Sequence, residues 1–147
     1  MTGRNDSAPP AVLAFGLLGI IPFCSLPLAA LLAPNWMGVA AAVEAVYAAL
    51  ILSFLGGARW GLAVRDASPN PVVVGLAMTP TLVGLAVLVF SHGEMRVQLL
   101  ALAAALTLSW AWDFSAKDLP PWYGRFRTVL TLGAVGGLCV GAMQVQQ

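Results

Sequence analysis

Five long apolar stretches dominate this chain of 147 residues and constrain its fold more than any other feature. Each is close to the twenty or so residues that a helix needs to cross about 30 Å of hydrocarbon. Lipid offers the backbone no hydrogen-bonding partners, so a segment of this length crosses it as a helix. The sequence therefore predicts an all-α integral membrane protein, a compact bundle of five transmembrane helices. The predicted helices are Ala11–Leu32, Trp36–Leu62, Pro71–Phe90, Val97–Phe114 and Val129–Val145.

Composition and spacing exclude several other classes of protein. Hydrophobic residues make up 60% of the chain and charged residues 9%, whereas a soluble domain carries roughly 25% charged residues. Residues 1–10 form a short polar tail ahead of a single transmembrane domain, 11–147, whose connectors are too short for a soluble catalytic domain. A net charge of +1 gives no sign of nucleic-acid binding. Because Cys24, Cys139 and His92 form no cluster with metal-ligand spacing, we expect neither a metal nor a cofactor.

Basic residues concentrate on one side of the predicted bundle. Five spans place the N-terminal tail, the second connector and the fourth connector on the same side of the membrane. That side holds Arg4, Arg65, Lys117, Arg125 and Arg127, with Arg59 in the last turn of the second span. The other side holds Arg96. The positive-inside rule then predicts a cytoplasmic N-terminus and a C-terminus on the outer side.

Small residues recur every four positions in the second, fourth and fifth spans, which is typical of helices that pack closely in lipid. In the fifth span the row consists of Gly133, Gly137 and Gly141. Packing within the chain is one use of such a row. Docking of a second copy or of another membrane protein is the alternative.

Prolines interrupt two of the predicted helices. Pro22 and Pro27 lie in the first span and Pro80 lies halfway along the third. An interior proline leaves one backbone carbonyl without its helical donor and bends the helix. One interpretation is a kink whose freed carbonyls are satisfied by Ser25, Thr79 and Thr81. The other is a broken helix that lines a polar site.

Glu44 is the residue that costs most to place in the bilayer. It lies about 12 Å into the membrane if the second span is straight, where a charged carboxylate costs several kcal/mol. Tyr47 follows on the same helical face, and the proline-bent part of the first span, with Ser25, has a similar depth. These three residues, Glu44, Tyr47 and Ser25, are therefore a candidate intramembrane polar site. The alternative is a neutral, hydrogen-bonded side chain that fixes helix register.

Arg59 and Asp113 are a second candidate pair. They lie near the same end of the second and fourth spans, carry opposite charge, and each adjoins a row of small residues. A bidentate contact would tie the two helices together. Independent snorkelling of both side chains to the headgroups is the alternative.

The fourth connector is the most polar internal segment. Aromatic residues alternate there with basic ones, a pattern that predicts contact with anionic lipid headgroups or an ordinary positive-inside anchor. The candidate headgroup contacts are Lys117, Trp122, Tyr123, Arg125 and Arg127.

Two motifs resemble the signatures of a known family. The first is ILSFLGGARWGLA at 51–63 and the second is LPPWYGRFR at 119–127. Together they resemble the transmembrane protein 69-like family, a domain of unknown function. The matching positions are Gly56, Gly57, Arg59, Trp60, Gly61, Trp122, Tyr123 and Arg127. The resemblance implies a bacterial inner membrane, or mitochondria for relatives, with a periplasmic C-terminus in the bacterial case. It implies no activity, substrate or catalytic residue.

These observations favour a non-enzymatic accessory, assembly or scaffold component of a membrane complex. The expected partners are the bilayer, including anionic lipid, and either a larger complex or a second copy docked through the fifth span. A small transporter or proton-linked carrier built around Glu44 is the alternative. An enzyme is disfavoured because the sequence offers no nucleophile–base pair, ligand set or phosphate loop.

Overall fold

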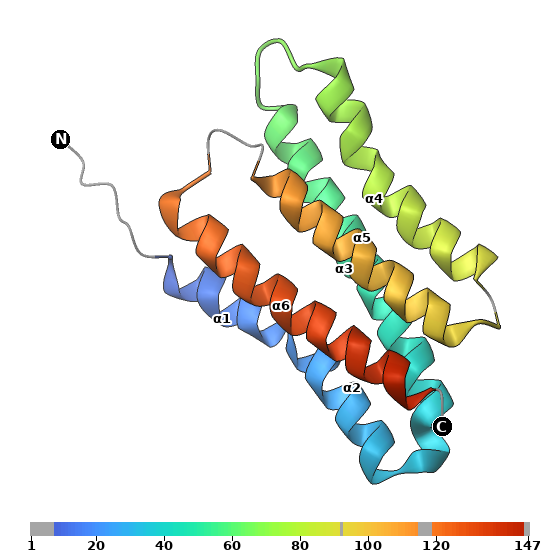
Figure 1. Cartoon of the computed structure of the whole chain (residues 1–147). Coiled ribbons are helices and arrows are strands. Elements are labelled where there is room, and N and C mark those ends of the chain that lie inside the picture. The colour runs from blue at the N-terminus through green and yellow to red at the C-terminus, as the bar shows by residue number, and fades with distance from the viewer. Residues whose placement is uncertain (1–7, 92, 115–118, 146–147) are drawn as a thin grey trace.

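The computed structural model describes residues 8–91, 93–114 and 119–145, and all its regular elements are helices. They are α1 (Pro10–Leu18), α2 (Ile21–Leu32), the short 3₁₀ helix η1 (Pro34–Trp36), α3 (Met37–Ala63), α4 (Pro71–Phe90), α5 (Met95–Asp113) and α6 (Pro121–Gln144). With α1–α2 and η1–α3 each counted as one span, five helical segments are long and apolar enough to cross a membrane. The all-α, five-span prediction is confirmed. Figure 1 places the start of α1 and the end of α6 at opposite ends of the bundle.

The long helix α3 is the centre of the bundle and contacts α2, α4, α5 and α6. Its row of small residues makes this possible, since Ala41, Ala45 and Ala49 are all buried. Large buried side chains of α2, α5 and α6, together with Leu52 of α3 itself, complete the core around this row. The largest fully buried apolar side chains are Phe23, Leu52, Leu99, Leu102, Leu106 and Leu138.

Prolines begin three of the α-helices, α1, α4 and α6, and also the 3₁₀ helix η1. The first helical position suits proline because its missing N–H has no intrahelical acceptor there. The sequence prediction was wrong for α6, which begins at Pro121 rather than Val129. The basic residues after Pro121 suggested an interfacial connector. The helix continues through them because Arg127 is ion-paired inside the bundle.

The first span is interrupted at Gly19–Ile20, between α1 and α2. Pro22 lies in the first turn of α2 rather than inside a continuous helix. At the break, the Gly19 carbonyl accepts a hydrogen bond of 2.9 Å from the Tyr47 hydroxyl. A side chain of α3 thereby satisfies a backbone group that lipid cannot.

Two interior prolines each leave one backbone carbonyl without its helical donor, and the surroundings of these two carbonyls differ. Pro80 frees the Leu76 carbonyl, and the Thr79 hydroxyl donates to it at 2.7 Å, as the sequence predicts. Pro27 frees the Phe23 carbonyl, which lies against Gly137 so closely that a Cβ there would overlap it. Ser25, expected to serve this purpose, has an exposed side chain. The missing Cβ lets α6 approach the bend in α2.

The glycine row of α6 packs within the chain. A Cβ on Gly133 would come within 2.9 Å of Ile20, and one on Gly141 would collide with the Glu44 carboxyl. Gly137 contacts α2 as described above. All three glycines contact residues of the same chain, as the first interpretation of this row expects.

Candidate functional site

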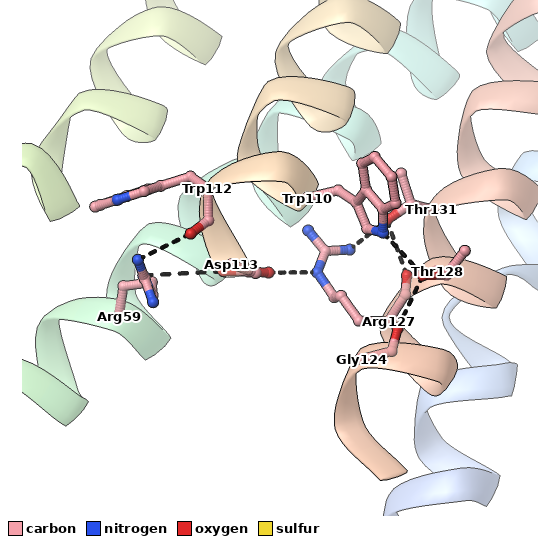
Figure 2. Close-up of polar contacts among 8 residues, drawn as sticks. All are labelled: Arg59, Trp110, Trp112, Asp113, Gly124, Arg127, Thr128 and Thr131. Carbon is pink, nitrogen blue, oxygen red and sulfur yellow. Dashed lines mark hydrogen bonds and ion pairs between the residues drawn. The ribbon is translucent and has the colours of Figure 1, made fainter. Parts of the chain in front are cut away.

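Asp113 is the centre of a buried polar cluster that joins three helices (Figure 2). It is the last residue of α5 and is 6% exposed. Arg127 of α6, 5% exposed, donates from Nε to Asp113 Oδ2 at 2.8 Å and from Nη1 to the Thr131 hydroxyl at 2.8 Å. Thr131 in turn donates to the Arg127 carbonyl one turn back, at 2.9 Å. The guanidinium is therefore held from two sides.

Arg59 reaches the same carboxylate from α3. Its Nε lies 3.9 Å from Asp113 Oδ1, and its Nη2 donates to the Trp112 carbonyl at 3.2 Å. The guanidinium carbon also lies 4.3 Å from the centroid of the Trp112 ring, which is within cation–π range. The structure thus brings together the two residues that the sequence pairs, but not in the expected bidentate geometry. The shorter contact to Asp113 belongs to Arg127.

Further hydrogen bonds fix the α5–α6 hairpin beside this cluster. The Trp110 indole N–H donates to the Thr128 hydroxyl at 2.9 Å, and that hydroxyl donates to the Gly124 carbonyl at 2.8 Å. Figure 2 shows these contacts next to the Asp113–Arg127 pair. The indole orients one side of the hairpin while the ion pair holds the other. Chemically, the cluster is suited to cross-linking helices and to holding an anion, since its donors are guanidinium groups.

Glu44 lies in the other half of the bundle and is 1% exposed. Its carboxyl group packs against Gly141, and Oε1 has no hydrogen-bond partner among the described residues. The surrounding gap, lined by residues of α2, α3 and α6, has no volume into which a water-sized molecule fits. The expected trio is not assembled, because Tyr47 bonds to Gly19 and Ser25 faces outward. The sequence identified neighbouring helices that carry these three residues, but it did not show in which direction each side chain points.

The expected lipid-contacting residues fall into three groups. Arg125 is exposed, and Trp122 and Tyr123 are half-buried, all in the first turns of α6. Arg127 is buried in the ion pair, which corrects its assignment as an exposed headgroup contact. Lys117 lies outside the described residues.

Two glutamines serve a structural purpose that the sequence analysis missed. Gln98 Nε2 donates to the Leu88 carbonyl at 3.1 Å, near the end of α4. Gln144 Nε2 donates to the Pro27 carbonyl at 3.1 Å and so joins α6 to the bend in α2. Both are polar residues at the ends of otherwise apolar stretches, and that pattern was available in the sequence. Among the described residues, no three His, Cys, Asp or Glu side chains lie close enough to hold a metal ion.

The two motif segments meet in space although about sixty residues separate them in the chain. Arg59 comes from the first and Arg127 from the second, and both contact Asp113, which belongs to neither. Gly56 of the first motif lets α4 approach, since a Cβ there would lie 2.6 Å from the Ala77 carbonyl. Gly57 has open space around it. Of the motif positions, Gly56 thus serves helix packing, and Arg59 and Arg127 serve the ion cluster.

Comparison with known proteins shows the family to which the chain is related. A family model described as "Protein of unknown function (DUF3429)" matches residues 8–143. Transmembrane protein 69 of Xenopus tropicalis is 34% identical over 140 residues, which cover 92% of this chain and 54% of that protein. Transmembrane protein 69 of Mus musculus is 34% identical over 133 residues, with 88% and 54% covered. The chain spans about half the length of these curated relatives. No solved structure matches.

Proposed function

The chain belongs to the DUF3429 family of membrane proteins, and from that premise we propose that it is a non-enzymatic accessory, assembly or scaffold component of a membrane complex. One observation carries this proposal. The charged groups Arg59, Asp113 and Arg127 contact one another and join α3, α5 and α6. Ionisable residues inside a membrane protein are expensive and usually serve function. Here they are used to hold helices in a fixed arrangement.

The outer surface of the bundle also suits an accessory role. Large side chains such as Phe54, Phe90 and Phe114 are at least 60% exposed. In a bilayer such a surface is covered by lipid or by other membrane helices. A rigid bundle with an apolar exterior can dock against a larger assembly without a soluble domain.

Association with a complex is the direct test of the proposal. The tagged protein, expressed from its own locus, should migrate with a larger assembly on native gels after solubilisation in a mild detergent. Deletion of the locus should lower the amount of that assembly. The Asp113→Asn variant, which loses the charge that joins the helices, should reduce co-migration more than Asp66→Asn, whose side chain is exposed. Recovery only as a free monomer, with unchanged complexes in the deletion strain, would contradict the proposal.

A small transporter or proton-linked carrier is the second candidate function, favoured by Glu44. A buried carboxyl oxygen without a hydrogen-bond partner is unusual and could exchange a proton or an ion. The closed packing around it opposes this use. Flux into liposomes separates the candidates: a carrier loses flux in Glu44→Gln and keeps it in the matched, exposed Glu94→Gln. Equal leak-level flux in all three proteins would reject the carrier.

We place the protein in a bacterial inner membrane, with Arg65 and Arg125 on the cytoplasmic side and the C-terminus in the periplasm. The bias of basic residues toward that end supports this orientation. Single cysteines at positions 66 and 94, in a background without Cys24 and Cys139, should be labelled from opposite sides of the membrane. Labelling of both from the same side would overturn the orientation.

A further inference from the structure

A groove with a volume of about 540 Å³ lies between α1, α3 and α6. Its walls are mainly apolar, with Phe15 and Ile20 on one side and Phe54 and Leu55 on the other. α1 lies along α6 (Figure 1), and the break at Gly19–Ile20 lies in the groove wall. Cavities of this size and character are typical of ligand sites.

One face of α6 gives the groove a polar edge. Tyr123, Arg127 and Thr131 line it at intervals of four residues, which is the spacing of one helical face. Tyr123 and Arg127 also line a second, smaller cavity of about 180 Å³, together with Asp113 and Phe114. A large apolar space and a small polar one therefore share two wall residues. That combination fits an amphiphile, with its chain in one space and its head in the other.

Arg127 supplies the positive charge that such a head group needs. Its Nε is bonded to Asp113 and its Nη1 to Thr131, whereas Nη2 is buried and has no hydrogen-bond partner among the described residues. The Asp113 carboxylate also lines the small cavity, but it already receives Arg127 Nε and lies 3.9 Å from Arg59. A guanidinium group in the wall of both spaces favours an anionic oxygen as its ligand.

The charge of this end of the bundle selects the kind of head group. Arg65 and Arg125 are exposed there, close to the ends of α3 and α6 that carry Arg59 and Arg127. Basic residues at a membrane surface attract anionic lipids and not zwitterionic ones. The charge of the site is thus complementary to a lipid head group that contains a phosphate and no positively charged group.

We propose that this groove binds one anionic phospholipid. The phosphate lies in the small cavity beside Tyr123 and Arg127, and an acyl chain lies in the groove along α6 from Arg127 toward Ala134. Those residues are seven apart, which is about 10 Å along a helix. The lipid fills the space between α1 and α3 and places its negative charge beside the ion cluster.

Native mass spectrometry of the delipidated protein in mild detergent tests this site. Phosphatidylglycerol, phosphatidylcholine with the same chains, and inorganic phosphate are titrated separately. The wild-type protein should bind one phosphatidylglycerol at least tenfold more tightly than phosphatidylcholine, and inorganic phosphate should neither bind nor compete. Ala58→Phe places a ring in the groove and should weaken phosphatidylglycerol binding at least tenfold. The matched control is Ala111→Phe, an exposed position of α5 outside the groove, which should bind like wild type.

A second variant addresses the head group. Arg127→Lys keeps a positive charge beside Asp113 but replaces the planar guanidinium with a single ammonium group, so it should lose the preference for phosphatidylglycerol over phosphatidylcholine. A purely structural role of Arg127 would leave that preference intact. The proposal is overturned by equal affinity of the wild-type protein for both lipids, or by competition from phosphate as strong as from lipid. Equal binding by Ala58→Phe and Ala111→Phe, or a second copy of the chain in place of lipid, would also overturn it.

Discussion

Two buried carboxyl groups, Asp113 and Glu44, show that the halves of this bundle are held together differently. Asp113 lies at the basic end, where two arginines from other helices contact it. Glu44 lies in the other half, packed against Gly141, with one oxygen that has no partner in the described structure. At the first end, charge joins the helices. In the second half, α6 reaches α2 and α3 because Gly137 and Gly141 have no side chains.

The contrast shows how a bilayer changes the value of a polar residue. Lipid does not push helices together, so contact depends on close packing and on interhelical polar bonds. The Asp113 cluster uses polar bonds, and the α2–α6 contact uses packing supported by the Gln144–Pro27 hydrogen bond. Glu44 belongs to neither mechanism, because among the described residues it forms no ion pair and its Oε1 has no hydrogen-bond partner.

Removal of Asp113 should have the largest effect. Asp113→Ala leaves Arg59 and Arg127 buried together without a carboxylate, and breaking a buried ion pair in this way costs about 3–5 kcal/mol. The measurement is the free energy of unfolding in bicelles. Asp66→Ala, an exposed aspartate in the connector after α3, is the control and should change it by no more than about 0.5 kcal/mol. Similar values for the two variants would mean that charge does not hold the basic end together.

Adding one methyl group should disturb the other half less. Gly137→Ala forces a Cβ into the Phe23 carbonyl, and overpacking of this kind costs about 1–3 kcal/mol. The adjacent Gly136 has open space around it, so Gly136→Ala should be neutral or slightly stabilising. The same unfolding measurement applies. If both substitutions behaved alike, close backbone approach would not be what holds α6 to α2.

Replacing the Glu44 carboxyl should have the smallest effect on stability. Glu44→Gln keeps the size of the side chain and removes no hydrogen bond to Oε1 from any residue that the structure describes. We expect the free energy of unfolding to change by less than about 1 kcal/mol. A loss as large as that of Asp113→Ala would show that Glu44 is a structural support in its own right, and the contrast between the halves would disappear.

The fold was largely predictable because hydrocarbon thickness fixes helix length and hydropathy shows where each helix lies. The main error was at α6, where Arg125 and Arg127 were interpreted as residues of an interfacial connector. A basic residue can lie inside a helix when a partner neutralises it, and the partner, Asp113, comes from another helix. A hydropathy profile scores each residue separately, so it does not show that Arg127 pairs with Asp113.

The candidate sites were predictable in depth but not in direction. Arg59 and Asp113 were expected at the same level, and the structure places them together. Ser25 was expected at the level of Glu44, yet it lies on the exposed side of α2, between the buried residues Phe23 and Pro27. Rotation of a helix about its axis is decided by packing against its neighbours, here Gly137 against the Phe23 carbonyl. When both faces of a helix are apolar, sequence periodicity does not show which face points into the bundle.

A double-mutant cycle between Asp113 and Arg127 tests most directly whether a charge pair joins α5 to α6. Unfolding free energies are measured in bicelles for wild type, Asp113→Asn, Arg127→Gln and the double variant. If the 2.8 Å contact joins the helices, the two substitutions should be coupled by about 1–3 kcal/mol, with the double variant less destabilised than the sum of the single ones. Additive effects, with a coupling below about 0.3 kcal/mol, would contradict the claim that this ion pair holds the bundle together.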